Sequence, residues 1–395
     1  MTAKAAMATD VDLVILGGGC AGLSLALRLA ERPGLCQRMT VVEARPTYQH
    51  DRSWCFWRTG PHRYEHLLKR SWSNVALRSA TRAVEIDCAS MPYQLLEASA
   101  FYSYAQQTIS TNANVQLRLG TTVLGPPTPV AGGWYVDTSA GTLTAARVID
   151  TRPPHPPQRE DALLWQSFVG EELLCDRAVF DPNRVMLMDF ACDLPGAVAF
   201  TYVLPLADNR ALIETTLFDA QPHAPADLAR RQQAAVLRLC GAASAQVLRT
   251  EAGILPMGIT RPHTALGRGY YRAGLMSGAA RPATGFAFQR IQRWADACSA
   301  ALRNGYEPFG HRPDPLLTRL MDGLFLNVLR SHPERGPELF TSLFRHVSTP
   351  RMVRFLSDEA RFFDRVAVAA SLPTGLFLRQ LLRQVPRGAL RAQTT

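Results

Sequence analysis

Three glycines near the start of the chain have the G-x-G-x-x-G spacing of a phosphate-binding turn. They are Gly17, Gly19 and Gly22. An apolar run of strand length, Val11–Leu16, precedes them, and apolar residues at helical spacing follow them. A turn of this kind aims backbone N–H groups and the positive end of a helix dipole at a pyrophosphate.

The acid that completes this pattern is Glu43. It ends a second short apolar run, Met39–Val42, and its carboxylate can accept hydrogen bonds from a ribose diol. Strand, glycine turn, helix, strand and acid together predict a dinucleotide site. This stretch alone leaves the choice between FAD and NAD open.

Aromatic and charged residues gather shortly after Glu43. Asp51 and Arg52 precede three large aromatic residues on an expected loop. The aromatic residues are Trp54, Phe56 and Trp57. Two interpretations fit this group: a packed aromatic cluster, or an apolar ligand pocket with a polar edge.

The elements that must position these residues favour FAD. Short strands and glycine-rich turns from residue 115 onward predict an antiparallel meander that leads into a strand ending at Asp150. In flavoproteins such a meander returns the chain to the first βαβ unit. A loop from Gly278 to Gly285 then precedes an expected helix at 287–304. This loop is either a second anion site, suited to a flavin's phosphate or ring edge, or an ordinary strand-to-helix connection.

The composition argues against several other classes of protein. The chain has 395 residues and a formal net charge of +10. It contains no run of about 18 apolar residues that could span a bilayer, and no signal peptide is expected in the first ten residues. No nucleic-acid motif accompanies the positive charge, so we expect no nucleic-acid partner. The eight cysteines show neither C-x-x-C pairs nor zinc spacing, which predicts reduced thiols in a cytoplasmic protein without a metal.

The C-terminal region, residues 316–390, is helical by pattern and interleaves phenylalanine with arginine. The phenylalanines are Phe340, Phe344, Phe355, Phe362 and Phe363. Helices of the core explain this pattern, and a basic, aromatic face resting on a membrane surface is the alternative.

Several segments, taken in order, resemble signatures of the lycopene cyclase family of carotenoid flavoproteins. The glycine turn with Glu43 matches the family's FAD fingerprint. Residues 51–57 resemble its Arg-Thr-Trp-x-Phe signature, with Ser53 in place of threonine. The other matching segments are residues 148–152, 187–190, 212–216, 255–258 and 278–285. The resemblance runs from the N-terminus to about residue 285.

This resemblance implies an α/β fold of the geranylgeranyl-reductase/hydroxylase type. We expect a FAD-binding Rossmann-type domain at residues 1–158, with an inserted segment at 51–92 near the substrate, and its return segment at 261–305. An antiparallel-sheet substrate domain is expected at 159–260, with residues 253–258 as a turn. Residues 306–395 are expected to form the C-terminal helical region, which is the candidate for contact with a membrane.

The implied activity is closure of a β-ionone ring at one or both ψ-ends of lycopene or a related linear carotene, without net redox change. The implied cofactor is reduced FAD, with NAD(P)H as its reductant. The expected cofactor-binding residues are Gly17, Gly19, Gly22, Glu43, Arg52, Asp150, Gly278 and Gly285. The implied enzyme works at the surface of a membrane, and the sequence leaves its oligomeric state open.

The chemistry of ring closure selects the catalytic candidates. An alkene is a very weak base, so the acid must be aimed at it, and a carboxyl among apolar residues keeps its proton near neutrality. The resemblance makes Glu214 that acid, with Asp189 as a proton-accepting or orienting partner and Glu251 as a weaker third candidate. The aromatic faces of Trp54, Phe56 and Trp57 suit a carbocation.

Two other functions fit the same motifs. A FAD-dependent monooxygenase acting on an apolar isoprenoid or aromatic substrate would share the FAD motifs and the two-domain plan. A flavoprotein that only binds or delivers carotenoid would not need Glu214.

Overall fold

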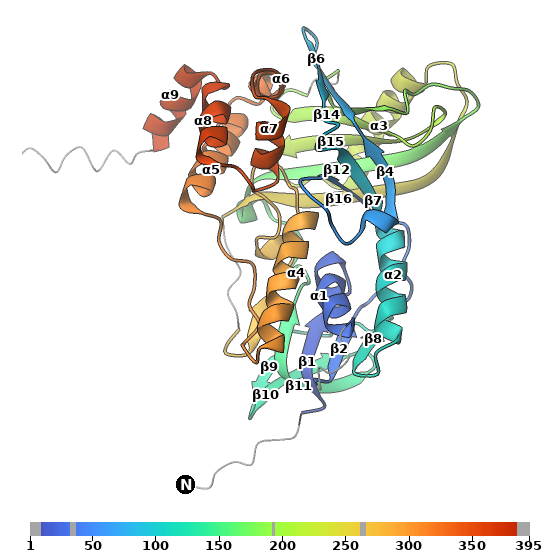
Figure 1. Cartoon of the computed structure of the whole chain (residues 1–395), viewed down its shortest axis with the longest axis vertical. Helices are drawn as coiled ribbons and strands as arrows, with labels where there is room; N and C mark the ends of the chain where they lie inside the picture. Colours follow the sequence, from blue (N-terminus) through green and yellow to red (C-terminus); the bar gives the residue numbers. More distant parts are fainter. Residues whose placement is uncertain (1–8, 32–36, 192–193, 261–265, 385–395) are drawn as a thin grey trace, which may run out of the picture.

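Two large sheets organise the chain. The computed structural model describes residues 9–31, 37–191, 194–260 and 266–384. Within these residues, seven strands form a lower sheet, seven form an upper sheet and three form a smaller sheet. Figure 1 shows the two large sheets following one another along the long axis of the molecule.

The lower sheet is built on parallel strands. Its centre is β1 (Val11–Leu16), which lies between β2 (Met39–Val42) and β11 (Gly141–Asp150) and pairs in parallel with both. An antiparallel meander extends the sheet beyond β11, and a late strand returns to pair with β11 in parallel. The other strands are β8 (Val115–Arg118), β9 (Thr128–Val130), β10 (Gly133–Thr138) and β17 (Tyr270–Arg272). This order confirms the predicted Rossmann-type sheet with its meander.

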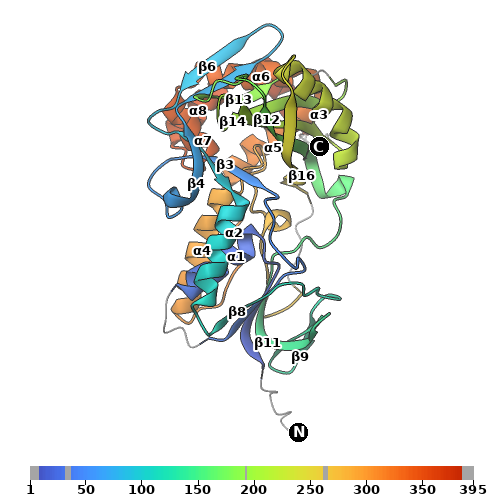
Figure 2. The same cartoon turned by 90° about the vertical axis from the view of Figure 1, so that its right-hand side faces the viewer.

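Three helices cover one face of the lower sheet, as Figure 2 shows. They are α1 (Cys20–Ala30), α2 (Ala98–Ser110) and α4 (Phe288–Arg303). The first of them packs against both of the others and is buried along nearly its whole length. A helix in that position must be apolar on most sides, which explains the run of leucine and alanine after the glycine turn.

The upper sheet is mostly antiparallel. Its long strand β12 (Ala162–Cys175) lies between β15 (Arg210–Asp219) and β16 (Ala245–Ile259). The other strands are β14 (Val198–Pro205), β13 (Arg184–Asp189), β5 (Asn74–Arg78) and β6 (Ala83–Asp87). Helix α3 (Pro225–Cys240) lies against β12 and β15.

One sequence prediction in this sheet is wrong. Residues 253–258, expected to form a turn, continue the strand β16, which pairs with β12 from end to end. Glycine and proline are tolerated there because β16 is the edge strand of the sheet. As a result Glu251 lies in the middle of a strand rather than beside a turn.

The predicted inserted segment at 51–92 is shared between two sheets. Its first part contributes β3 (Ser53–Trp57) and β4 (Leu68–Trp72) to the small sheet, where both pair with β7 (Tyr93–Glu97). Its second part supplies β5 and β6 to the upper sheet, where β5 pairs in parallel with β13.

The C-terminal region is helical, as predicted, up to residue 384. Its helices are α5 (Leu316–Ser331), α6 (Gly336–His346), α7 (Thr349–Leu356), α8 (Phe362–Ala370) and α9 (Thr374–Gln384). They lie beside the upper sheet in Figure 1 and share a core with it, in which Phe340 packs against Phe190 and Phe218. No helix within the described part of the chain is long and apolar enough to cross a membrane.

The domain boundaries remain predictions. Residues 1–8, 261–265 and 385–395, which fall within the predicted regions, lie outside the described residues. The same holds for Cys36 and Cys192 among the eight cysteines.

Candidate active site

One cavity of about 580 Å³ extends from the glycine turn of the lower sheet to the central strands of the upper sheet. At the lower end it is lined by the start of α1 and by residues of the 45–54 segment. At the upper end it is lined by Tyr202, Leu212, Glu214 and Glu251, and its wall between them includes residues 284–288.

The glycine turn at the lower end is shaped by close backbone contacts. Gly17 has a φ of +98°, and a Cβ on Gly22 would lie 2.0 Å from the Gly17 carbonyl oxygen. A Cβ on Gly19, in contrast, would meet nothing within 4 Å, and Gly19 lines the cavity. The backbone at Gly19 and the N-terminus of α1 are therefore open to a ligand in the cavity.

Glu43 faces this turn from the end of β2. Its carboxylate accepts hydrogen bonds from the Gly18 N–H at 2.7 Å and from the Arg45 side chain at 3.0 Å. Burial by itself would raise the pKa of Glu43, but the hydrogen bonds and charge of Arg45 outweigh it and hold that pKa below its usual range. Asp51 lines this end of the cavity, and its buried Oδ1 has no hydrogen-bond partner among the described residues.

The eight predicted cofactor residues separate into three groups. Gly19, Arg52 and Gly285 line the cavity, while Gly17, Gly22 and Glu43 shape and brace the turn.

Asp150 and Gly278 are not among the described residues that line the cavity. Asp150 is buried at the end of β11, where Arg152 and the Tyr270 hydroxyl hydrogen-bond it. It therefore joins β11 to the returning strand β17 rather than facing a ligand.

The aromatic residues after Arg52 also have different positions. Trp54 lines the cavity and stacks on Phe288, at the start of α4, with ring centroids 5.3 Å apart. Phe56 also stacks on Phe288, and Trp57 packs on Tyr93; both Phe56 and Trp57 are buried in the core. Packing thus accounts for Phe56 and Trp57, and only Trp54 is placed to contact a ligand in this cavity.

Two glutamates meet at the upper end of the cavity. Glu214 on β15 and Glu251 on β16 are both registered with Gly170, on the strand between them. The Thr216 hydroxyl donates a hydrogen bond to Glu214 at 2.9 Å. Burial, the charge of Glu251 and a hydrogen bond donated to the Glu251 carboxylate together raise the pKa of Glu214 to about 8. Glu214 therefore holds a proton at neutral pH.

Glu251 is bound by a guanidinium group and a hydroxyl group. Its carboxylate accepts hydrogen bonds from Arg249 at 2.5 Å and from the Ser53 hydroxyl at 2.8 Å. Arg249 also donates to Ser53 at 2.7 Å and pairs with Glu172 at 2.6 Å. Glu251, whose charge raises the pKa of Glu214, is thus fixed in place by residues of β12, β16 and the 53–57 segment.

Asp189 does not reach this pair. It is fully buried and forms ion pairs with Arg78 at 2.6 Å and with Arg238 of α3 at 2.8 Å. Burial alone would raise its pKa, but the two guanidinium groups hold that pKa below its usual range.

Asp189 and Glu214 lie on opposite faces of the upper sheet. Asp189 is registered with Thr201, which is registered with Thr215, and Thr215 hydrogen-bonds Gln232 of α3. Because neighbouring residues of a strand point to opposite faces, Glu214 points away from α3. This placement argues against the role predicted for Asp189; the acid on the same face as Glu214, across Gly170, is Glu251.

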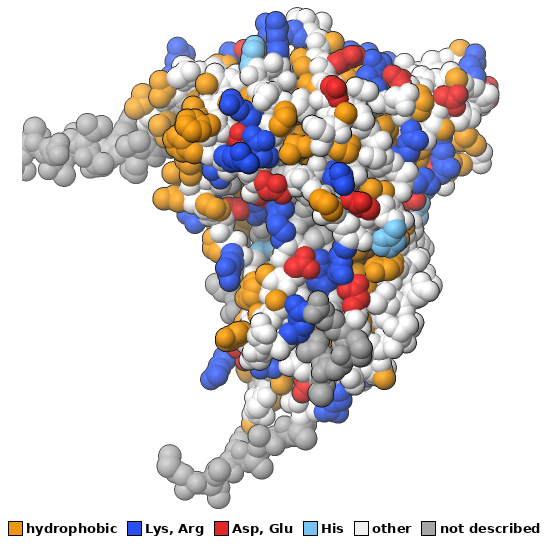
Figure 3. Space-filling view, viewed as in Figure 1, with side chains coloured by type: hydrophobic (Ala, Val, Ile, Leu, Met, Phe, Trp, Pro, Cys, Tyr) orange, Lys and Arg blue, Asp and Glu red, His pale blue; other side chains and the backbone are white. Residues whose placement is uncertain are grey.

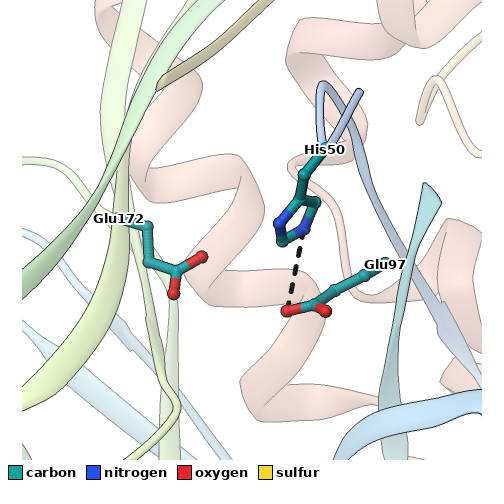
Figure 4. A group of neighbouring side chains, drawn as sticks. All are labelled: His50, Glu97 and Glu172. Carbon is teal, nitrogen blue, oxygen red and sulfur yellow. Dashed lines mark ion pairs between the residues drawn. The ribbon is translucent and has the colours of Figure 1, made fainter. Parts of the chain in front are cut away.

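A third group of polar side chains lies near the ion pairs of Arg249. Figure 4 shows His50 between Glu97 and Glu172, with the His50–Glu97 pair at 3.7 Å. Their ligand atoms lie within 4.8 Å of one another, a spacing that could suit a metal ion. Lys69 already pairs with Glu97, however, and Arg210 and Arg249 pair with Glu172. We therefore describe the group as part of an ion-pair network.

A second cavity, of about 280 Å³, lies between the upper sheet and the C-terminal helices. Its lining is almost entirely apolar. It shares Tyr202, Thr284 and Phe286 with the first cavity, so these side chains separate the two spaces. Leu378 and Leu381 of α9 line it and are also exposed on the surface, which places its outer end at α9.

Apolar side chains gather around that outer end, and Figure 3 shows them over α8 and α9. Phe362 and Phe363 are 65% and 71% exposed. The other exposed large apolar residues on α5, α8 and α9 are Leu316, Leu317, Leu320, Val366, Leu378, Leu381 and Leu382.

The fold and the site together define a two-sheet α/β protein in which a dinucleotide turn and a pair of acids share one cavity. Solved structures have the same fold. A geranylgeranyl bacteriochlorophyll reductase-like protein from Thermoplasma acidophilum matches with a TM-score of 0.56 at 12% identity, over 95% of this chain and 97% of that one. The p-nitrophenol 4-monooxygenase of Pseudomonas putida DLL-E4 matches with a TM-score of 0.56 at 16% identity, over 95% and 98%.

The chain belongs to the lycopene cyclase protein family, whose model matches residues 12–381. Among curated relatives, the lycopene beta-cyclase of Pantoea ananas is 24% identical over 310 residues, covering 74% of this chain and 75% of that protein. The lycopene beta-cyclase of Pseudescherichia vulneris is 25% identical over 386 residues, covering 92% and 94%. The resemblance seen in the sequence motifs is confirmed.

Proposed function

We propose that this protein is a lycopene β-cyclase, which closes a β-ionone ring at one or both ψ-ends of lycopene or a related linear carotene. The observation that carries the proposal is the position of Glu214. It is a protonated carboxyl at neutral pH, in a cavity that also reaches the dinucleotide turn. Family membership makes a carotene the substrate class.

The reaction that fits this cavity starts with a proton. Glu214 gives its proton to C2 of the terminal double bond, which leaves a tertiary cation at C1. The C5=C6 double bond attacks C1 and closes the ring, and loss of a proton from C6 gives the β ring. The substrate and product are isomers, so no net electron transfer is needed. A general acid positioned in this way typically contributes about 10²–10⁴-fold to the rate.

The walls of the cavity protect the cation. Trp54 and Tyr202 offer aromatic faces, and Leu212 and Phe168 keep the surface around Glu214 apolar. Aromatic faces attract a cation, and an apolar wall that excludes water prevents water from adding to the cation.

FAD is the cofactor that fits the lower end of the cavity. The open backbone at Gly19 and the N-terminus of α1 suit a pyrophosphate, and Glu43, with Asp51 and Arg45 nearby, suits the hydroxyl groups of a dinucleotide. In its reduced, anionic form FAD would supply a negative charge that stabilises a cation in the same cavity. NAD(P)H would serve as the reductant of the flavin.

The apolar cavity beside the C-terminal helices provides a path for the substrate. A carotene is confined to bilayers, and the exposed side chains of α5, α8 and α9 surround the outer end of this cavity. We propose that this face rests on a membrane as a peripheral contact. Replacing Phe362 and Phe363 by serine should release the protein from anionic liposomes in a sedimentation assay, while replacing the exposed Leu237 on α3 should not. Equal sedimentation of both variants would contradict the contact.

The test of the function is expression in a bacterial host that accumulates lycopene, followed by product identification. The proposal predicts β-ring products with the wild-type chain and unchanged lycopene with Glu214→Gln. The alternative, a FAD-dependent monooxygenase, predicts oxygenated products and oxygen uptake coupled to turnover. A carotenoid-binding flavoprotein predicts no difference between the two chains.

A further inference from the structure

Glu214 and Glu251 lie on the same face of the upper sheet, on either side of Gly170. Both are registered with Gly170, so one complete strand separates their backbones. Strands in a sheet lie about 4.8 Å apart, which puts side chains two strands apart at roughly 10 Å if they stand upright. For the two carboxyl groups to meet, both side chains must lean over the middle strand, and atoms of both lie close to the space above Gly170.

Gly170 leaves the space that they lean into. A Cβ at this position would lie 3.2 Å from the Glu214 Cβ and 3.3 Å from both the Glu251 Cγ and the Leu212 Cδ1. The backbone at Gly170 does not require glycine, because its φ lies outside the left-handed region. Glycine also weakens the interior of a strand. The residue is thus explained by the space that it leaves open between the two acids.

We propose that Glu214 and Glu251 act as one catalytic pair that shares a single proton across Gly170, and that the proton leaving the ring returns to this pair. Gly170 is the positioning residue. The second half of the proposal rests on the proposed ring closure; the shared proton does not.

The proton balance of the cycle closes within the pair. Before the reaction Glu214 carries the proton and Glu251 is the anion bound by Arg249. Donation to C2 forms a C–H bond and leaves two carboxylates beside a carbocation. Breaking the C6–H bond gives its electron pair to the new ring double bond and its proton to one of the carboxylates. The pair is again singly protonated, so no outside acid or base is consumed.

Other groups around the pair set its charge. The charged neighbours are Arg249, which binds Glu251, and Glu172, which binds Arg249. His50 lies beyond them, and the charges of Arg249, Glu172 and Glu251 affect its pKa. The neutral neighbours that face Glu214 or Glu251 are Ser53, Cys55, Tyr93, Tyr202 and Thr216. Because each of these carboxyl groups can be replaced separately, the contribution of each one to the protonation of Glu214 can be measured.

The shared proton is tested by infrared spectroscopy of the purified full-length protein, without substrate. The wild-type chain should show a protonated-carboxyl band at pH 7 that is absent in Glu214→Gln. In Glu251→Gln the titration midpoint of this band should fall by at least one pH unit, because the charge that holds the proton is gone. The matched control is Glu172→Gln, which removes the other partner of Arg249 and should leave the band. An unchanged midpoint in Glu251→Gln would overturn the pair.

Gly170→Ala tests the positioning role. The added methyl must push the acids apart by a few tenths of an ångström, so the midpoint should fall in the same direction as in Glu251→Gln. Val169→Ala, on the opposite face of the same strand, is the control for strand damage. If Gly170→Ala folds and titrates like the wild type, the positioning role is overturned; if it does not fold, Glu251→Gln and Glu251→Asp decide the pair.

The return of the proton is tested by the pH profile of Glu251→Gln. If Glu251 only raised the pKa of Glu214, lowering the pH until Glu214 is protonated would restore the full rate of Glu251→Gln. The proposal predicts that kcat stays at least tenfold below wild type even there, because the acceptor is missing. Full recovery at low pH would contradict it. Since the infrared test needs no substrate, failure of the proposed function and failure of the pair are distinguishable.

Discussion

The two ends of the cavity are built in different ways. The lower end, with its glycine turn and Glu43, comes from one continuous stretch of about thirty residues around β1, α1 and β2. The upper end joins Gly170, Glu214 and Glu251 from three strands that are far apart in the sequence. The lower end is therefore specified by local spacing, whereas the upper end depends on the register of a sheet.

Because the two ends are built differently, substitutions at each end should have different effects. Changes at the upper end should alter the protonation of an acid and leave the bound dinucleotide in place. Changes at the lower end should alter cofactor binding and leave the acid pair unchanged. Substitutions at each end therefore test whether the acid pair and the dinucleotide site are independent.

The largest effect is expected for Glu214→Gln. Because glutamine cannot supply the proton but has nearly the same shape, ring formation should fall by about 10²–10⁴-fold. Product yield with purified protein measures the rate, and flavin absorbance after purification measures the other end of the cavity. Loss of the flavin together with activity would show that the two ends are not separate.

The second effect is the pH dependence of the wild-type rate. The raised pKa of Glu214 means that its active, protonated form predominates below about pH 8. As the pH rises through that value the proton is lost, so kcat should fall about tenfold per pH unit on the alkaline side. A rate that stays level to pH 10 in a range where the protein remains folded would rule out Glu214 as the acid.

The lower end was more predictable from the sequence than the upper end. The glycine spacing, the meander and Glu43 are recognisable because each acts through neighbours in the chain. Asp189 and Glu214 both looked like acids on apolar strands, and only strand register shows that they point to opposite faces. From the sequence Glu251 is the weaker candidate, because residues 253–258 just after it have the composition of a turn, whereas pairing along β12 keeps them in the strand.

The sequence gives even less indication of the positions of Phe288 and Gly170 in the site. Phe288 is an ordinary apolar residue at the start of a helix, and nothing in its neighbours predicts that Trp54 and Phe56 stack on it. Gly170 did carry a signal, because an isolated glycine within a strand often marks a close approach. Sequence alone does not say what approaches it.

A third prediction separates two glycines of the turn. Gly19→Ala meets nothing in the folded chain but occupies the space where a pyrophosphate would lie, so it should weaken FAD binding at least tenfold without changing the Tm of the apoprotein. Gly22→Ala places its Cβ 2.0 Å from the Gly17 carbonyl oxygen and should lower both. Flavin titration and thermal unfolding of the two apoproteins provide the comparison; a lower Tm for Gly19→Ala would show that the turn is not open.

The smallest effect is expected for Ser53→Ala. Its hydroxyl connects Glu251 with Arg249, and loss of one hydrogen bond of this kind costs about 1 kcal/mol, a few-fold in rate. Since Arg249 still binds Glu251, flavin content should not change. A loss comparable with that of Glu214→Gln would mean that the 53–57 segment, rather than the sheet, positions the acids.

The most direct test of the account is a single turnover of protein equilibrated in D₂O, followed by mass spectrometry of the product. Protonation by a carboxyl that has exchanged with solvent predicts one deuterium at C2 of the first ring closed, and no added oxygen. Product without deuterium, or product that contains oxygen, would contradict proton-initiated ring closure by Glu214.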